Sequence, residues 1–327
     1  MAYRGPVSDH FDGKHFYNLE KFTKNAWGVI KWQLKRKPGP WPDFVSNSQF
    51  GLPELRLTPE KLAVTFINHA TVLIQTAGLN ILTDPIWSER CSPLSWIGPK
   101  RVHPPGIAFE NLPPIDLVLI SHDHYDHLDI PTLKRLQEHF NPLFISGLGI
   151  NSLLQSQDRQ LTSVDLDWWQ QHKHREALVT FVPAQHWSSR SLFNSNTTLW
   201  GGFVISTPQF KIYYSGDTAM GKHFQMIQQR FTELSLAILP IGAYEPRWFM
   251  QAAHINPEEA LIAYQILNAR YGLGVHFNTF AHLADDAYNQ PLDDLAKAQK
   301  KLAIAEKQFR TLQPGETWFI NTDGKSG

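Results

Sequence analysis

The stretch "SHDHYDHLD", residues 121–129, directly follows the apolar run "IDLVLI", residues 115–120. A short apolar run bounded by polar residues is typical of a buried β-strand. Three histidines and three aspartates within nine residues at the end of such a strand indicate a metal site, because imidazole and carboxylate groups are ligands for divalent ions such as zinc.

Side chains alternate along an extended segment, so His122, His124 and Asp126 are expected to point one way and Asp123 the other. His127 follows where the chain is expected to turn, and from there it can reach a second position close to the first. The stretch therefore predicts a pocket with room for two divalent ions, in which Asp123 takes no part.

Similar strand-like runs recur along the chain, with helical patterns between them. They predict one layered α/β domain without repeats or low-complexity segments. The expected strands include "LAVTFI", "TVLIQT", "LNILTD", "PLFIS", "LVTFVPA", "GGFVIS", "FKIYYSGD", "LAILPIG" and "YGLGVHF". The expected helices are "IPTLKRLQEHF", "GKHFQMIQQRFTEL", "NPEEALIAYQILNAR" and "DDLAKAQKKLAIAEKQF".

Two helix starts carry capping signals. Asn256 precedes Pro257 and two glutamates, which predicts an N-cap followed by proline at the first helical position. Asp129 is expected to cap the helix that follows the histidine-rich stretch.

Composition narrows the functional class. The chain has 327 residues, with 30 Lys and Arg against 30 Asp and Glu, so nothing favours nucleic-acid binding. The single cysteine, Cys91, rules out an internal disulfide framework or a multi-cysteine metal site. The sequence shows neither a signal-peptide pattern nor a run long enough to cross a bilayer, and we expect a cytoplasmic protein, with peripheral membrane attachment left open.

Residues 1–56 differ from the rest, since they are rich in proline and tryptophan and have little periodicity. Trp27, Ile30 and Leu34 fall at helical spacing before Pro38. We expect an N-terminal arm that packs on the domain or touches a membrane surface, followed by a hydrolase domain over residues 57–327.

The histidine-rich stretch resembles the metal motif of the metallo-β-lactamase superfamily, and the other ligands of that motif occur in family order over about 155 residues. The resemblance implies a four-layer αββα sandwich with two central β-sheets, holding two divalent ions. It implies that His122, His124 and His186 bind one ion, that Asp126, His127 and His276 bind the other, and that Asp217 bridges them.

Other histidines compete for these roles. His282 lies six residues beyond His276, but past the expected strand, so His276 is preferred. His172 and His174 belong to a polar stretch and are expected to be solvated.

Two further residues match recurrent positions of the superfamily. Asp84 is expected to orient the ligand loop, and His69 to support a ligand. For Asp84, the alternative is a turn former ahead of Pro85.

Longer runs are similar to the N-acylphosphatidylethanolamine phospholipase D branch of the superfamily. They are "NLPPIDLVLISHDHYDHLD", "VPAQHWSSRSLFNSNTTLWGGFVI" and "LPIGAYEPRWFMQAAHINPEEA". The resemblance implies a zinc phosphodiesterase that releases N-acylethanolamine and phosphatidic acid, with a hydroxide held between the two ions as nucleophile. Iron or manganese also suits His and Asp ligands.

Four side chains are candidates for roles beside the metals. Asp126 is expected to orient the nucleophile, and His254 to contact substrate or protonate the leaving group, unless it serves only the helix start. Tyr244 and Arg247 are expected to bind substrate, with an internal salt bridge as the alternative for Arg247.

Two other functions stay open. A cytosolic hydrolase of a small lactone, ester or cyclic phosphate would use the same site. A non-catalytic metal-binding or membrane-attachment module is disfavoured, because every ligand of the motif is present. A homodimer is also left open.

Overall fold

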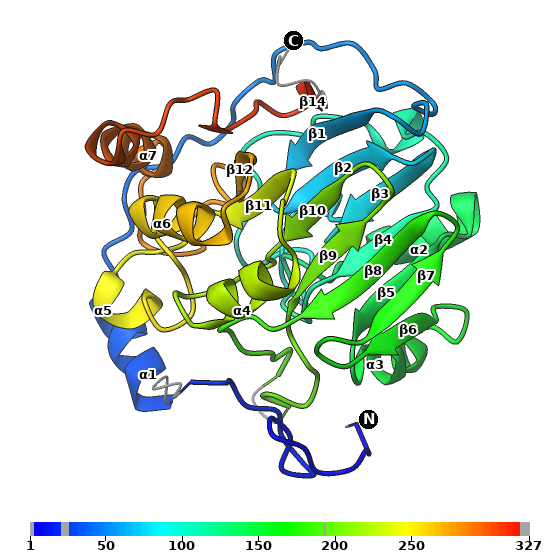
Figure 1. The fold of residues 1–327 in the computed structure, drawn as a ribbon. Helices are drawn as coiled ribbons and strands as arrows, with labels where there is room; N and C mark the ends of the chain where they lie inside the picture. The colour runs from blue at the N-terminus through cyan, green and yellow to red at the C-terminus, as the bar shows by residue number, and fades with distance from the viewer. Residues whose placement is uncertain (1–2, 21–25, 192–193, 321–327) are drawn as a thin grey trace.

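Two seven-stranded mixed sheets form the centre of the computed structural model, which describes residues 3–20, 26–191 and 194–320 (Figure 1). The order of the first sheet is β14–β1–β2–β3–β4–β5–β6, and that of the second is β13–β12–β11–β10–β9–β8–β7. The first comprises β1 (Leu62–Asn68), β2 (Thr71–Thr76), β3 (Leu79–Thr83), β4 (Leu117–Ile120), β5 (Leu143–Gly147), β6 (Ser163–Leu166) and β14 (Thr317–Ile320). The second comprises β7 (Gln171–His174), β8 (Ala177–Val182), β9 (Gly202–Ser206), β10 (Lys211–Tyr214), β11 (Leu236–Pro240), β12 (Tyr271–Val275) and β13 (Phe309–Arg310).

The surroundings of strand β4 explain why its sequence is apolar without interruption. Leu117 and Leu119 face the core between the two sheets, whereas Val118 and Ile120 face a second cluster under the outer helices. Because both faces of the strand are covered, every position must be apolar.

Helices cover the outer faces of both sheets and complete the four layers. Figure 1 shows α4, α6 and α7 on one side and α2 and α3 on the other. The predicted four-layer α/β sandwich is therefore confirmed. The helices are α1 (Ala26–Lys35), α2 (Ile130–Phe140), α3 (Ile150–Gln157), α4 (His223–Arg230), α5 (Arg247–Met250), α6 (Pro257–Leu267) and α7 (Gln290–Leu302), with a 3-10 turn over Phe109–Asn111.

The two predicted caps have different outcomes. Asn256 accepts from the Glu259 backbone N–H at 2.8 Å, and the Glu259 side chain accepts from the Asn256 N–H, so α6 begins with a full capping box. Asp129 stands at the N-cap position of α2 but makes no capping hydrogen bond. Its carboxylate accepts from Ser88 and Thr132 instead, and the expected cap is wrong because these neighbours occupy its oxygens.

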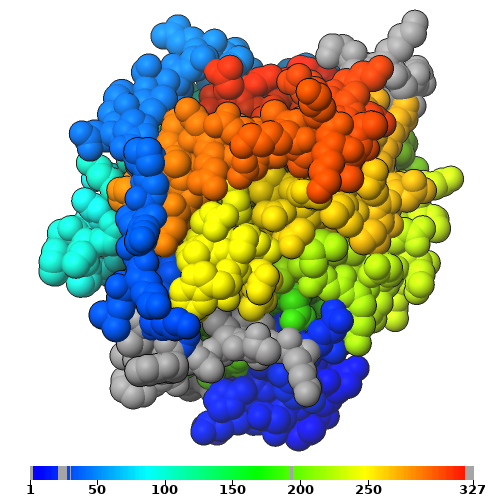
Figure 2. All heavy atoms as spheres, turned by 90° about the vertical axis from the view of Figure 1, so that its left-hand side faces the viewer, coloured from blue at the N-terminus to red at the C-terminus, as the bar shows by residue number. Residues whose placement is uncertain are grey.

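The described part of the N-terminal segment lies against the rest of the protein. Phe11 and Phe16 belong to the main core cluster. Farther along, Arg36 pairs with Asp285 at 3.0 Å, and the Gly39 N–H donates to the Asp285 carbonyl. Figure 2 shows this blue segment running beside the yellow and orange parts of the chain. The division at residue 56 stays a prediction.

Helix α1, Ala26–Lys35, covers the positions that were predicted at helical spacing. The side chains of Trp27 and Ile30 lie outside the described residues, whereas that of Leu34 is 83% exposed. In the described ranges, no helix combines the length and apolar character needed to cross a membrane.

His10 anchors the start of the N-terminal arm, and protonation of His10 should make the docking of the arm depend on pH. Its ring stacks on Trp168 at 4.3 Å, with nitrogen atoms 2.7 Å from Asp167 and 2.6 Å from Asp9. Burial lowers the pKa of His10, but its hydrogen bonds with Asp167 and Asp9 outweigh burial and leave the pKa above its usual value. Because the pKa of His10 is raised in the folded state, its contribution to the free energy of unfolding is fully present below the unfolded pKa of about 6.5. This contribution is lost as the pH rises through the folded pKa.

We therefore expect the difference in unfolding free energy between the wild type and His10→Gln to be largest near pH 6 and to shrink at higher pH. Urea unfolding at a series of pH values measures this difference. His15→Gln, in the same segment but with its side chain 44% exposed, is the control. A pH-independent difference would contradict the expectation.

Candidate metal centre

The predicted ligands come together at the ends of four strands. The histidine-rich stretch follows β4, His186 follows β8, Asp217 follows β10 and His276 follows β12. Strands β10, β11 and β12 are parallel, so their carboxyl ends meet at one edge of the second sheet. The chain turns at the histidine-rich stretch, where the N–H groups of His127 and Leu128 both donate to the His124 carbonyl.

Three histidines form the first group. His122 Nε2 lies 2.9 Å and His186 Nε2 lies 3.3 Å from His124 Nδ1. His186 Nδ1 is 2.9 Å from the Ala253 carbonyl oxygen, and this contact directs Nε2 of the ring toward the other two. Three imidazole nitrogens meeting at these distances match one face of a metal coordination sphere.

The second group combines histidine and carboxylate. His127 Nε2 and His276 Nε2 each lie 3.3 Å from Asp217 Oδ2, and they lie 3.4 and 3.3 Å from Asp126 Oδ2. His69 joins this group, with Nε2 2.9 Å from Asp126 Oδ2. His69 therefore stands where it can support Asp126 or bind a metal itself.

Asp217 connects the two groups, since its Oδ2 also lies 3.9 Å from His186 Nε2. His254 Nδ1 is 3.8 Å from the same oxygen. The side chain of His254 is 12% exposed, so it stands at the more open side of the cluster. Gly216, just before Asp217, has a φ of 60°, and a Cβ there would overlap the Ser121 side chain, which explains the glycine of the "SGD" run.

Asp84 fixes the ligand loop through hydrogen bonds that its carboxylate accepts. Its Oδ1 accepts from the Ser121 N–H at 2.7 Å, and its Oδ2 lies 2.7 Å from His127 Nδ1. The hydroxyls of Ser121 and Tyr214 donate to the same Oδ2. A carboxylate that accepts from the far nitrogen of a histidine fixes the ring and leaves Nε2 free for a metal.

Protonation in the cluster follows from burial and from the two carboxylates. Burial, with neighbouring imidazoles, holds the pKa of His122 and His124 well below the usual value, so both are neutral. Burial also opposes charge on His276, but Asp217 and Asp126 outweigh it and raise the pKa to about 9. In the absence of a metal, the His276 ring therefore holds a proton, and with it a positive charge, beside the two carboxylates.

The residues fit a divalent ion. Buried atoms of the cluster that make no hydrogen bond to described residues include His127 Nε2, His276 Nε2 and Asp217 Oδ1. Leaving buried polar atoms unpaired is costly, and a divalent cation would satisfy several of them and neutralise the carboxylates.

Comparisons with known proteins agree with this geometry. The model of the β-lactamase superfamily domain matches residues 79–277. N-acyl-phosphatidylethanolamine-hydrolyzing phospholipase D 1 of Caenorhabditis elegans is 35% identical over 94% of this chain and 93% of its own length. The chain belongs to the metallo-β-lactamase superfamily, in its N-acylphosphatidylethanolamine phospholipase D-like branch. It is a metal-dependent hydrolase with a divalent metal site.

Two further similarities are less extensive. The mitochondrial N-acyl-phosphatidylethanolamine-hydrolyzing phospholipase D of Saccharomyces cerevisiae is 36% identical over 67% of this chain, which spans 47% of the yeast protein. The structure of Igni18, a metallo hydrolase of Ignicoccus hospitalis, superimposes on 80% of this chain and 99% of its own, with a TM-score of 0.59 and 22% identity. The second likeness concerns the fold alone.

Tyr244 and Arg247 are engaged inside this phospholipase D-like hydrolase. The Tyr244 hydroxyl donates to Asp294 at 2.7 Å, and the residue is 2% exposed. Arg247 Nη2 donates to both carboxylate oxygens of Glu259, at 2.8 and 3.0 Å, and Nη1 donates to the His254 carbonyl at 2.9 Å. Their placement gives no support to substrate binding, which stays a prediction, and shows Arg247 in the alternative role of a salt-bridge partner.

The competing histidines lie apart from the cluster. His282 is not among the grouped ligands of the described residues, and its carbonyl accepts from Arg36. His172 and His174 belong to β7 at the edge of the second sheet. Asp123 also points away, because its Oδ2 accepts from Thr198, and burial raises its pKa to about 6.

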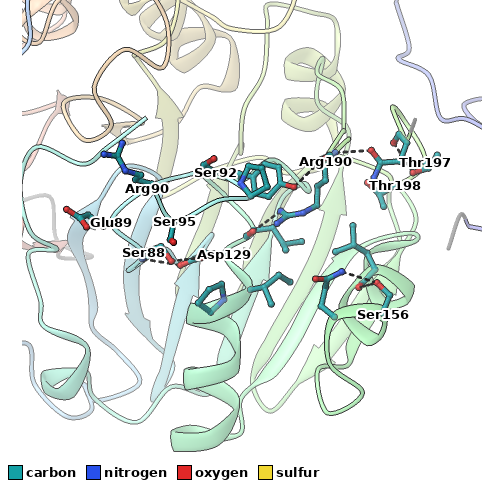
Figure 3. Close-up of a pocket in the computed structure, with 18 residues that line it drawn as sticks. Ser88, Glu89, Arg90, Ser92, Ser95, Asp129, Ser156, Arg190, Thr197 and Thr198 are labelled. Carbon is teal, nitrogen blue, oxygen red and sulfur yellow. Dashed lines mark hydrogen bonds between the residues drawn. The ribbon is translucent and has the colours of Figure 1, made fainter. Parts of the chain in front are cut away.

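A pocket of about 810 Å³ lies beside the ligand loop (Figure 3). Its walls include Tyr125 and Leu128 of that loop, but none of the grouped ligands. The guanidinium carbon of Arg190 lies 3.8 Å from the centroid of the Tyr125 ring, and Nη1 of Arg190 donates to the Leu128 carbonyl. This arginine, which the sequence did not single out, ties the ligand loop to the segment after His186.

Proposed function

We propose that the protein is a phospholipase D-type phosphodiesterase that hydrolyses N-acylphosphatidylethanolamine to N-acylethanolamine and phosphatidic acid, using two zinc ions. The observation that carries the proposal is the pair of ligand groups joined by Asp217, in a chain that resembles the Caenorhabditis elegans enzyme over nearly its whole length. In the proposed ligand set, His122, His124 and His186 hold one ion, and Asp126, His127 and His276 hold the other.

Two such ions would activate water for attack on phosphorus and neutralise the phosphate oxygens. The residues of the chain supply the rest. Asp126 Oδ2 lies within 3.4 Å of His69, His127 and His276, and this central position in the cluster supports a role in orienting the nucleophile. His254 stands at the open side of the cluster, where an imidazolium can give its proton to the departing ethanolamine oxygen.

The loop over residues 92–97, which borders the pocket beside the ligand loop, supports a lipid substrate. Ser92 and Ser95 line the pocket of Figure 3, whereas Leu94, Trp96 and Ile97 are 45%, 72% and 52% exposed. Hydroxyls therefore face the pocket while large apolar groups face solvent. Such a loop suits a membrane surface, with polar headgroups on one side and acyl chains on the other.

Helix α1 and Trp248 of α5 carry a second group of exposed apolar side chains. Leu34 is exposed beside Trp248, which is 48% exposed and carries the Lys31 ammonium 5.2 Å from its ring centroid. Exposed apolar side chains next to lysines are typical of peripheral membrane contact. The proposal places the protein on the membrane surface; the homodimer stays a prediction.

The test is an assay with liposomes that contain N-acylphosphatidylethanolamine. We expect release of N-acylethanolamine that is abolished by a chelator and restored by zinc. A Trp96→Ser/Ile97→Ser double variant should lose about thirtyfold or more on liposomes, because burial of two such side chains is worth on the order of 1–3 kcal/mol each, while a short-chain monomeric substrate is cleaved as before.

Phe319→Ser is the matched control, because Phe319 is 44% exposed on β14. A protein that releases no N-acylethanolamine but hydrolyses a lactone or cyclic phosphate would refute the lipid assignment. Equal loss on both substrates in the double variant would refute the membrane role of the loop.

A further inference from the structure

The side chain of Asn18 holds the backbone of His186, 168 residues later in the chain. The His186 N–H donates to Asn18 Oδ1 at 3.0 Å, and Asn18 Nδ2 donates to the His186 carbonyl at 2.7 Å. One amide thus pairs with both peptide groups of His186, as a neighbouring β-strand would.

Buried Trp200 fixes the amide in place. Its indole N–H lies 3.0 Å from Asn18 Oδ1 and 3.1 Å from the Ala184 carbonyl, between the arm and the segment before His186. The indole is fully buried, so this contact is shielded from water. Because Oδ1 accepts two N–H groups, the amide orientation is determined, with Nδ2 facing the His186 carbonyl.

A second arm residue binds the loop that carries Asp217. Glu20 accepts from the Lys222 N–H at 2.8 Å through its carboxylate, and its carbonyl accepts from Gln185 at 3.4 Å. The Gln185 carbonyl in turn accepts from the Ala219 N–H. The arm therefore spans the segments on which His186 and Asp217 stand.

The arm is itself anchored. Phe11 and Phe16 are each 1% exposed and belong to the main core cluster, and the Phe16 N–H donates to the Asn196 carbonyl at 2.8 Å. Asn18 follows two residues later and is fixed from this side as well. An anchored amide can hold a ligand loop in a way that a mobile one cannot.

We propose that Asn18 is a positioning residue of the metal centre, which sets the place of His186 Nε2 by pairing with the His186 backbone. Together with the Ala253 carbonyl at Nδ1, it fixes the residue from the backbone and from the far side of the ring. The inference rests on His186 as a metal ligand and is independent of the substrate. It makes the N-terminal arm part of the hydrolase site.

The test is zinc binding by the full-length chain. Asn18→Asp keeps the acceptor for His186 and Trp200 but turns a carboxylate oxygen toward the His186 carbonyl. We expect the ion bound by His186 to dissociate 10–100-fold more readily, as is usual when a supporting partner of a ligand is lost. Competition with a chromophoric chelator and metal analysis measure this change.

Two reference variants define the result. His186→Ala identifies which ion depends on that histidine, and Asn18→Asp should weaken the same ion. Tyr17→Phe, which removes only a hydrogen bond to the Ser8 carbonyl at 3.1 Å, should bind zinc like the wild type. If His186→Ala binds both ions normally, the ligand assignment fails and the inference with it.

Melting of the metal-free variants separates positioning from mere anchoring. If Asn18→Asp lowers the melting temperature but leaves zinc affinity unchanged, Asn18 only fastens the arm and the inference is overturned. Asn18→Ala, which removes the amide without adding charge, gives the same comparison should the aspartate prevent folding. Unchanged zinc affinity in both Asn18 variants would also overturn it.

Discussion

Asp217→Asn is expected to lower kcat/KM for N-acylphosphatidylethanolamine by about a thousandfold or more, because several kcal/mol of transition-state stabilisation depend on correctly placed metal ions. Oδ2 of Asp217 lies within 3.9 Å of nitrogen atoms from both ligand groups. The amide that replaces it carries no negative charge and offers only one oxygen. Steady-state kinetics and metal analysis of the purified variant measure the loss.

Asp165→Asn is the control for removing a partly buried carboxylate elsewhere. Asp165 accepts from Ser146 and from the Gly149 and Asn151 N–H groups, outside the cluster. It should bind two ions and keep its activity. Activity of Asp217→Asn within tenfold of the wild type would refute the bridging role.

Asp84→Asn should destabilise the fold and weaken metal binding together. Four donors bind the Asp84 carboxylate in the wild type. The asparagine amide turns an N–H toward at least one of them, and each buried donor left unpaired costs about 1–3 kcal/mol. Because His127 loses a partner that fixes its ring, we expect 10–100-fold weaker binding of the ion beside it. Chemical unfolding and zinc titration measure the two effects.

Asp116 offers a matched comparison, because it stands just before β4, whereas Asp84 stands just after the neighbouring parallel strand β3, at the opposite end of the sheet. Its carboxylate accepts from the Asn80 N–H at 2.9 Å and pairs with Arg56 and Arg175. Asp116→Asn should lower stability without changing zinc affinity. Equal zinc affinity in the Asp84 and Asp116 variants would show that Asp84 is only a turn former.

Much of the architecture was legible in the sequence because the fold buries whole strands. Runs such as that of β4 are apolar on both faces, and each ends where a polar stretch begins, so the sequence located the edge at which the ligands meet. The helix start at Asn256 was also predictable, because its cap is made within four residues.

Elements without a local signal were missed. Strand β7 is a polar edge strand, "QHKH", which pairs with β8 and buries little, so no apolar alternation marks it. Helix α3 begins at Ile150 with no side-chain cap. The alternation of side chains that the sequence predicted for the ligand stretch was also carried too far. The chain turns at His124, so the strand-like conformation ends there.

The supporting contacts of the site could not be predicted, because they join distant parts of the chain. Arg190, Tyr214 and Asn18 meet the ligand segments only after the sheets have packed. For Arg247 the sequence left two roles open, substrate contact and an internal salt bridge, and the structure shows its guanidinium paired with Glu259. One sequence records which residues are present, but not which distant partner each will find.

The link between Asn18 and His186 bears on how the protein is made. On the ribosome, Asn18 emerges long before its partner, and the 167 residues between them must close as one large loop. This contact cannot form before residue 186 has been synthesised, and the last ligand of the cluster, His276, follows 90 residues later. The full set of ligands can therefore assemble only late in synthesis.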